Sequence, residues 1–156
     1  MHIWLNEPHV FEWWGNDGTT EDDIEKRYLP MVLGTDFTKG FIIMYESKPI
    51  GFIQVYKLND YPEWEHHLNM KDNVAGIDIF IGEKEFVGKG LGTKIIKKFV
   101  DEIVFTSYDV IACIADPSEK NIASVKAFQN AGFSYLKNSH DPETGDKEIV
   151  LQLKKH

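Results

Sequence analysis

Runs of hydrophobic residues in two patterns predict the strands of a sheet. Residues 41–46 and 50–56 are rich in β-forming side chains, and 47–49 supply turn residues between them. This part of the chain therefore predicts an antiparallel hairpin. Residues 74–81 predict a third strand, and the uninterrupted apolar run at 110–115 predicts a buried central strand.

Hydrophobic positions about one helical turn apart predict helices. Thr20 and Asp23 have the spacing of an N-terminal cap, and the helix that they begin runs to about Leu33, just before Gly34. A second helix follows the glycines at 88–92. Its apolar face comprises Leu91, Ile95, Ile96, Phe99, Val100 and Ile103.

A third helix is predicted after the buried strand. Residues 116–121 lead into it, and Gly132 ends it. The helical spacing directs Ile122, Val125 and Phe128 inward.

The remaining segments complete the predicted architecture. Residues 1–6 have the pattern of a helix end, and 15–20 predict a turn-rich break. Residues 57–73 predict a long polar loop, which at this length is more often functional than a simple connection. Residues 133–136 and 148–153 predict a hairpin. The order of elements predicts a mixed α/β sheet with two helices that cross over between strands.

The composition fits one folded domain over residues 1–156. The chain is 42% hydrophobic and 13% aromatic, which suffices for a core. Its single cysteine, Cys113, excludes an internal disulfide, and its apolar neighbours indicate a buried thiol in a reducing compartment. The longest apolar run is six residues and no signal-peptide pattern begins the chain, so we expect a cytoplasmic protein without a membrane partner.

The net charge of −8 bears on the partners of the protein. With 25 acidic and 17 basic residues, the chain repels nucleic acid and attracts a cationic partner. Solubility alone is the alternative explanation for the charge.

Three alternating glycines, Gly88, Gly90 and Gly92, stand directly before a predicted helix. The N–H groups and the positive dipole end there attract an anion, and glycines let it approach the backbone. A nucleotide phosphate loop requires four residues before its Gly-Lys pair, but five separate Gly82 from Gly88, so that interpretation fails. The dinucleotide fingerprint fits weakly because its third glycine would come one residue later. A site for the pyrophosphate of coenzyme A fits, with a flexible turn as the alternative.

Several short motifs are spread over nearly the whole chain. They are Glu12-Trp13-Trp14-Gly15, Tyr28-Leu29-Pro30, Pro49-Ile50-Gly51-Phe52, Gly76-Ile77-Asp78, the glycine loop at 88–93, Asp116-Pro117-Ser118 with Asn121, and Ala131-Gly132-Phe133. In these motifs the chain resembles the GNAT superfamily of N-acetyltransferases, and within it the bacterial aminoglycoside 6′-N-acetyltransferases. The resemblance implies acetyl-CoA as donor, pantetheine between two splayed parallel strands, and acetyl transfer to a primary amine, the 6′-amino group of an aminoglycoside.

The resemblance also implies roles for individual residues. Asp78 is implied as the catalytic base, on the strand face that it shares with Phe80, where an aspartate has to be solvated, paired or functional. Backbone N–H groups near Phe80 and Ile81 would polarise the thioester. The residues implied to bind the coenzyme are Phe80, Ile81, Val87, Gly88, Lys89, Gly90, Leu91, Gly92, Thr93, Ser118 and Asn121. The residues implied to bind the acceptor are Tyr28, Asp60, Trp64, Asp78 and Asp116.

Several of these residues have a structural alternative. Lys89 lies beside the pyrophosphate or is only solvated, and Asn121 binds pantetheine or caps the following helix. Trp64 provides a platform for a cationic sugar or packs into the core. His66 and His67 lack the spacing of a zinc helix, so we assign no metal.

Two departures from the family pattern affect the expected function. The family has an N-terminal strand before the first helix, so we expect either that this sheet lacks its first strand or that the sequence begins inside a longer chain. The family also has a tyrosine where this chain has Phe128, which has no proton to give to a departing thiolate. Two alternatives therefore stay open: transfer to another small amine, such as a polyamine, a hydroxylated lysine or an amino sugar, and a module that binds acyl-CoA or a cation without turnover. We expect a monomer or a homodimer.

Overall fold

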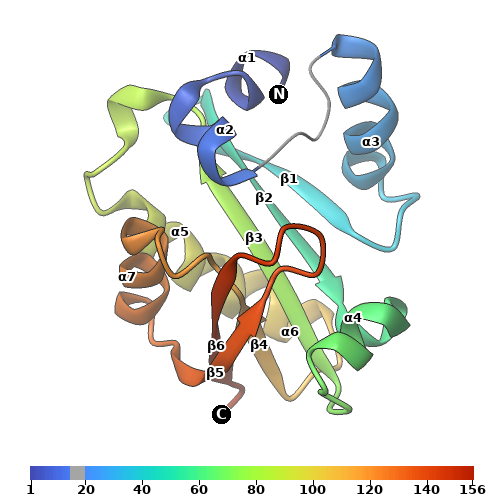
Figure 1. Ribbon diagram of the computed structural model, residues 1–156. Coiled ribbons are helices and arrows are strands. Elements are labelled where there is room, and N and C mark those ends of the chain that lie inside the picture. Colours follow the sequence, from blue (N-terminus) through green and yellow to red (C-terminus); the bar gives the residue numbers. More distant parts are fainter. Residues whose placement is uncertain (15–19) are drawn as a thin grey trace.

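Six strands form one mixed sheet in the computed structural model, which describes residues 1–14 and 20–156 (Figure 1). Their order across the sheet is β1-β2-β3-β4-β6-β5. The strands are β1 (Lys39–Tyr45), β2 (Lys48–Lys57), β3 (Val74–Ile81), β4 (Ala112–Ala115), β5 (Ser134–His140) and β6 (Lys147–Lys154). Only β3 and β4 pair in parallel. The predicted mixed α/β sheet and both hairpins are confirmed, and within the described residues no strand precedes β1.

Helices lie before β1 and between the strands. They are α1 (His2–Leu5), α2 (Pro8–Trp14), α3 (Glu21–Leu33), α4 (Pro62–His67), α5 (Leu91–Phe99), α6 (Phe105–Ser107) and α7 (Ile122–Asn130). A π-helical stretch, Val100–Val104, joins α5 to α6, and two short 3-10 turns lie at Leu58–Asp60 and Lys84–Phe86. Within the described residues, no helix is both long and apolar enough to span a membrane.

The predicted start and end of α3 are confirmed. The backbone N–H of Asp23 donates to Thr20 Oγ1 at 3.2 Å, a cap that stabilises a helix by about 1 kcal/mol. Gly34 follows the last turn with a φ of 77°, the left-handed conformation that glycine adopts without strain. Of the turn predicted at 15–20, residues 15–19 lie outside the described part of the chain.

One face of the sheet is covered by α5 and α7. The hydrophobic cluster there joins Ile96 and Phe99 of α5 and Val125 and Phe128 of α7 to buried strand residues. These strand residues are Ile43, Ile53, Val55, Ala75, Ile77, Cys113, Ala115 and Leu151. The predicted apolar face of α5 is thus confirmed, and Cys113 is a free, buried thiol.

The opposite face carries two separate hydrophobic clusters. The helical-cap cluster at one end is formed by α1, α2 and α3 packed on Phe52 and Phe80. The α4 cluster at the other end includes Tyr56, Leu58 and Ile114, with Trp64 against it. Figure 1 shows α1, α2 and α3 at one end of the molecule and α4 at the other. The part of this face that lies between the two hydrophobic clusters carries polar side chains.

Three expectations from the sequence are wrong in detail. The segment 57–73 is not a structureless loop, because β2 extends to Lys57 and a 3-10 turn and α4 follow it. Ile122 is 55% exposed because it occupies the first position of α7, before the helix packs on α5. The buried strand predicted from residue 110 begins at Ala112, and Ile111 is 57% exposed.

Candidate active site

The parallel strands β3 and β4 separate halfway along β3. Their pairing comprises Val74 with Ala112, Ala75 with Cys113 and Gly76 with Ile114, and it ends there. Strand β3 continues to Ile81, paired only with β2 on its other side. The edge of β3 from residue 77 onwards therefore faces an opening rather than a strand. An extended ligand with amide groups can hydrogen-bond to such an edge.

The glycine loop leads from this opening into α5. Gly88 and Gly90 have φ values of 75° and 72°, and Gly90 is the N-cap residue of the helix. Only glycine adopts these conformations without strain, and a Cβ atom at either position would meet nothing within 4 Å. The space beside the helix N-terminus is thus open to an anion.

The helix that the loop begins is held against α7. A Cβ atom on Gly92 would lie 3.8 Å from the Ala127 side chain, and Thr93 Oγ1 donates a hydrogen bond to the Ala127 carbonyl at 3.3 Å. Leu91 is half-buried and packs against the hydrophobic cluster on the face of the sheet that α5 and α7 cover, which is the core beneath the sheet. These contacts fix the direction in which the N-terminus of α5 points.

Four other residues implied to bind the coenzyme flank the loop and α7. Val87 is exposed, and Lys89 Nζ lies 5.8 Å from the centroid of the Phe86 ring. Asn121 caps α7, since its Oδ1 accepts from the Ser124 N–H at 3.1 Å. Ser118 Oγ accepts from the Lys120 N–H at 3.3 Å.

Polar side chains from three strands and from the residue after a fourth lie in a row across the face between the two hydrophobic clusters. Gln54 of β2 pairs directly with Asp78 of β3, and its Nε2 donates to Asp78 Oδ2 at 2.9 Å. Asp116 directly follows β4 and Glu148 belongs to β6. These four residues, Gln54, Asp78, Asp116 and Glu148, are called the polar row below.

Burial and neighbouring charges raise the pKa values of two acidic members of the polar row. Burial and the charge of Asp78 raise the pKa of Asp116 from 3.8 to about 7. Burial, followed by the charges of Asp116, Asp141 and Asp78, raises the pKa of Glu148 from 4.5 to about 8. Asp116 and Glu148 are therefore in part protonated near neutral pH.

Two oxygen atoms of the polar row are buried without a hydrogen-bond partner. They are Gln54 Oε1 and Glu148 Oε2. A buried acceptor that lacks a donor costs about 1–3 kcal/mol. Both atoms can accept from the N–H groups of a cationic ligand.

Tyr56 is the member of the α4 cluster that follows Gln54 on the same face of β2. It is buried, and burial and the charges of Asp78 and Asp116 raise the pKa of its hydroxyl well above 10.0. A Cβ atom at Gly76 would lie 2.3 Å from the Tyr56 ring, so only glycine leaves room for this side chain.

The remaining residues implied for the acceptor lie outside the row. Tyr28 is 3% exposed in the helical-cap cluster, where its hydroxyl accepts from Trp14 Nε1 at 2.7 Å. Asp60 is exposed on a 3-10 turn. Trp64 is half-buried against the α4 cluster, with its ring 5.3 Å from that of His67.

Three residues implied for the chemistry are placed as follows. Phe80 is buried, with its ring 4.8 Å from that of Trp14, and the Ile81 carbonyl is 3.0 Å from His9 Nε2. Phe128 is 3% exposed and packs edge-to-face on Phe133 with centroids 5.2 Å apart. In the described residues, no three His, Cys, Asp or Glu side chains are grouped so that they could hold a metal ion.

Sequence reasoning missed Gln54, Tyr56 and Glu148. Gln54 had a usable signal, because it is the one amide in the otherwise apolar stretch from Ile50 to Tyr56. Glu148 had none, because its place beside Asp116 depends on the pairing of β6 with the segment after β4.

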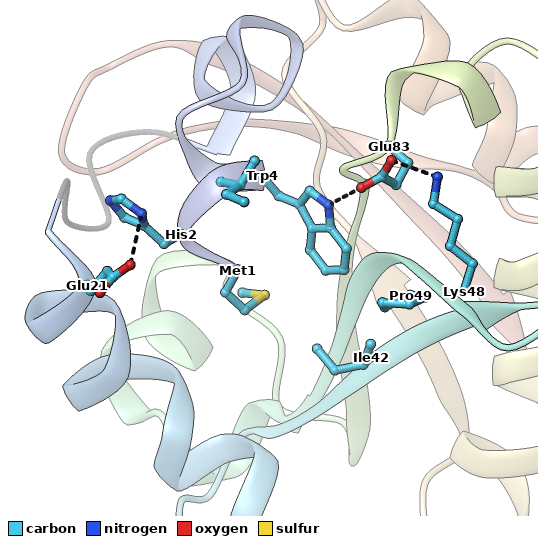
Figure 2. Close-up of a pocket in the computed structure, with 9 residues that line it drawn as sticks. Met1, His2, Trp4, Glu21, Ile42, Lys48, Pro49 and Glu83 are labelled. Carbon is cyan, nitrogen blue, oxygen red and sulfur yellow. Dashed lines mark hydrogen bonds and ion pairs between the residues drawn. The ribbon is translucent and has the colours of Figure 1, made fainter.

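A hollow of about 540 Å³ lies elsewhere, between α1 and the β1–β2 hairpin (Figure 2). Trp4 Nε1 donates to Glu83 Oε1 at 3.0 Å, and Lys48 Nζ lies 3.1 Å from Glu83 Oε2, so α1 is tied to the turn after β3. Ile42 and Pro49 also line the hollow. No member of the polar row lines it, which separates it from the candidate active site.

The splayed parallel strands, the glycine loop at a helix N-terminus and the carboxyl groups beside the opening are the layout of an acetyltransferase of the GNAT type. The chain belongs to this family, because the family model of the acetyltransferase (GNAT) domain matches residues 1–140.

Individual relatives extend the likeness. The aminoglycoside N(6′)-acetyltransferase type 1 of Klebsiella pneumoniae is 34% identical over 137 residues, which are 85% of this chain and 67% of that protein. The spermine/spermidine N(1)-acetyltransferase of Bacillus subtilis is 27% identical over 111 residues, 71% of this chain and 68% of that protein. The crystal structure of aminoglycoside acetyltransferase AAC(6′)-Ib in complex with coenzyme A and kanamycin is 29% identical, with a TM-score of 0.85 over 99% of this chain and 87% of that one.

Proposed function

We propose that this protein transfers the acetyl group of acetyl-CoA to the 6′-amino group of an aminoglycoside. The observation that carries the proposal is the likeness to an aminoglycoside acetyltransferase crystallised with coenzyme A and kanamycin, at a TM-score of 0.85. The polar row agrees with it, because an aminoglycoside carries several ammonium groups and carboxyl groups are their natural partners.

The glycine loop and the strand opening fit the donor. The open space beside Gly88 and Gly90 accommodates a pyrophosphate at the N-terminus of α5. The unpaired edge of β3 beyond Gly76 fits the amides of pantetheine. Acetyl-CoA, when bound, supplies an activated thioester. The N–H groups near Phe80 and Ile81 would then polarise its carbonyl.

Asp78 is the proposed base. An acceptor amine is mostly protonated at neutral pH, so a group beside it has to take a proton before the amine can attack. The hydrogen bond from Gln54 fixes the orientation of the Asp78 carboxylate. The negative charge of Asp116 lies close enough to that of Asp78 to raise the Asp116 pKa, and the two carboxyl groups together favour the approach of a cationic acceptor.

Phe128 leaves the departing thiolate without a tyrosine acid. Its ring is buried in the core beneath the sheet. A coenzyme A thiol is acidic enough to leave as thiolate or to take a proton from water, so we expect turnover without an acid at this position.

The likeness to polyamine acetyltransferases favours a second candidate acceptor. Spermine and spermidine are also polycations, and the relative named for them covers 71% of this chain. In either case we propose a cytoplasmic enzyme, in keeping with the reduced Cys113, that acts as a monomer or homodimer.

Release of free thiol from acetyl-CoA tests the proposal. We expect release in the presence of kanamycin, and with Asp78→Asn we expect kcat to fall by about 10²-fold or more, with its pH dependence lost. Thiol release with spermidine but with no aminoglycoside would support the second candidate. Binding of kanamycin without any thiol release would indicate a non-catalytic module instead.

A further inference from the structure

Glu148 is held beside the segment that follows β4. Its backbone forms a bridge with Ser118, and the neighbouring Ile149 N–H donates to the Pro117 carbonyl at 3.0 Å. On the other side of the bridge, the Glu119 N–H donates to the Lys147 carbonyl at 2.9 Å. These backbone bonds fix Glu148 opposite Ser118, two residues beyond Asp116, where the charge of Asp116 acts on the Glu148 carboxyl.

The direction of the Glu148 side chain follows from strand alternation. Leu151 pairs with Ala115 in the core beneath the sheet, whereas Val150 belongs to the α4 cluster on the opposite face. Glu148, two residues before Val150, shares that face. It lies at the end of the polar row farthest from Gln54, because β6 is separated from β2 by β3 and β4.

The carboxyl group of Glu148 has an oxygen without a hydrogen-bond partner and lies near other acidic groups. Its Oε2 is buried without a hydrogen-bond partner, while the residue as a whole is only half-buried. The charges that raise its pKa are those of Asp116, Asp141, Asp78 and Asp146, and of these Asp146 is paired with Lys120 Nζ at 3.5 Å. This arrangement does not stabilise the folded protein, because like charges near a half-buried carboxyl disfavour its ionised form. A cation with several N–H groups would satisfy both the charge and the unpaired oxygen.

We propose that Glu148, together with Asp116, binds a second ammonium group of the acceptor, one that is not acetylated. This inference rests on the proposed function, because it places the reacting amine at Asp78. It assigns acceptor preference to the far end of the polar row: molecules with two or more ammonium groups bind across the row, and molecules with one do not use Glu148.

The experiment compares two acceptors that share a 6-amino sugar. Kanamycin carries several ammonium groups, and methyl 6-amino-6-deoxyglucoside carries one. With Glu148→Gln, we expect KM for kanamycin to rise at least 10-fold and kcat to change less than 3-fold, since a charge-assisted hydrogen bond is lost from binding. For the monoamine, kcat/KM should stay within about 2-fold of the unmodified protein.

Two further variants separate binding from structure. Glu119→Gln removes the same charge from an exposed side chain on the adjacent segment, and it should leave both acceptors unaffected. Glu148→Asp keeps the charge and should recover part of the kanamycin affinity. Equal losses for both acceptors would assign Glu148 a structural role, and an unchanged KM for kanamycin would also overturn the proposal.

The second ammonium site can still be tested if the protein is not an active acetyltransferase. If the unmodified protein releases no thiol with any amine, calorimetric titration of kanamycin in the presence of coenzyme A takes the place of KM. A dissociation constant for kanamycin at least 10-fold larger in Glu148→Gln would still support the second ammonium site. Equal binding by the two proteins, or none by either, would refute it.

Discussion

Replacing Asp116 with asparagine should stabilise this protein while it weakens acceptor binding. The pKa of Asp116 is about 7, against 3.8 for a carboxyl in solution. Each pKa unit corresponds to 1.36 kcal/mol, so ionisation of this group above pH 7 costs the folded state at most about 4 kcal/mol. Part of the shift is charge repulsion from Asp78 and Asp141, which solvent and their own titration reduce, and we therefore expect about half of this value, roughly 2 kcal/mol.

The sign of the effect follows from the raised pKa. Below pH 3.8 the carboxyl is protonated in both the folded and the unfolded chain, and the substitution removes no charge. Between pH 3.8 and about 7 the unfolded chain releases its proton first, so the free energy of unfolding falls as the pH rises. Asp116→Asn removes this loss, and its advantage over the unmodified protein should grow across that window.

Urea denaturation followed by tryptophan fluorescence measures the difference. At pH 5 we expect Asp116→Asn to be more stable by less than about 1 kcal/mol, and at pH 8 by roughly 2 kcal/mol. Isothermal titration with kanamycin at pH 8 should show weaker binding by the same variant. A stability difference that does not change between pH 5 and pH 8 would refute the reasoning, because desolvation of the charged form would then not be its cause.

Two further predictions concern glycines. Gly90→Ala should raise KM for acetyl-CoA and lower stability by roughly 1 kcal/mol, because an alanine is strained at a φ of 72°, and thiol-release kinetics and thermal melting check both effects. Gly76→Ala should lower the melting temperature by at least about 5 °C in differential scanning calorimetry, because its Cβ would lie 2.3 Å from the Tyr56 ring; an unchanged melting temperature would mean that this ring moves freely.

The glycine loop and the strands were readable from the sequence because local patterns specify them. Alternating glycines before an apolar helical face indicate a helix start whatever the rest of the chain does, and Gly90 is the N-cap of α5. The cap at Thr20 likewise depends on neighbours three residues apart. Such features need no knowledge of long-range pairing.

The sequence predicts only two of the four residues of the polar row, because the long-range register of the strands brings the row together. Asp78 and Asp116 stand next to recognisable motifs, whereas Glu148 is adjacent only through the bridge between β6 and the segment after β4. The polar stretch at 57–73 misled for a related reason. Its charged residues are interspersed with Leu58, Leu68 and Met70, which are buried in the α4 cluster and hold the segment against the sheet.

The polar row takes its members from different strands, while donor binding is assigned largely to the loop before α5 and to the edge of β3. In evolutionary terms, this arrangement separates two traits that selection can act on. If the proposed acceptor site is right, a single codon change at Asp116 or Glu148 would alter one position along the acceptor without altering the loop at 88–92. Selection would then be able to change the preferred polycation in single steps while the acetyl donor stays the same.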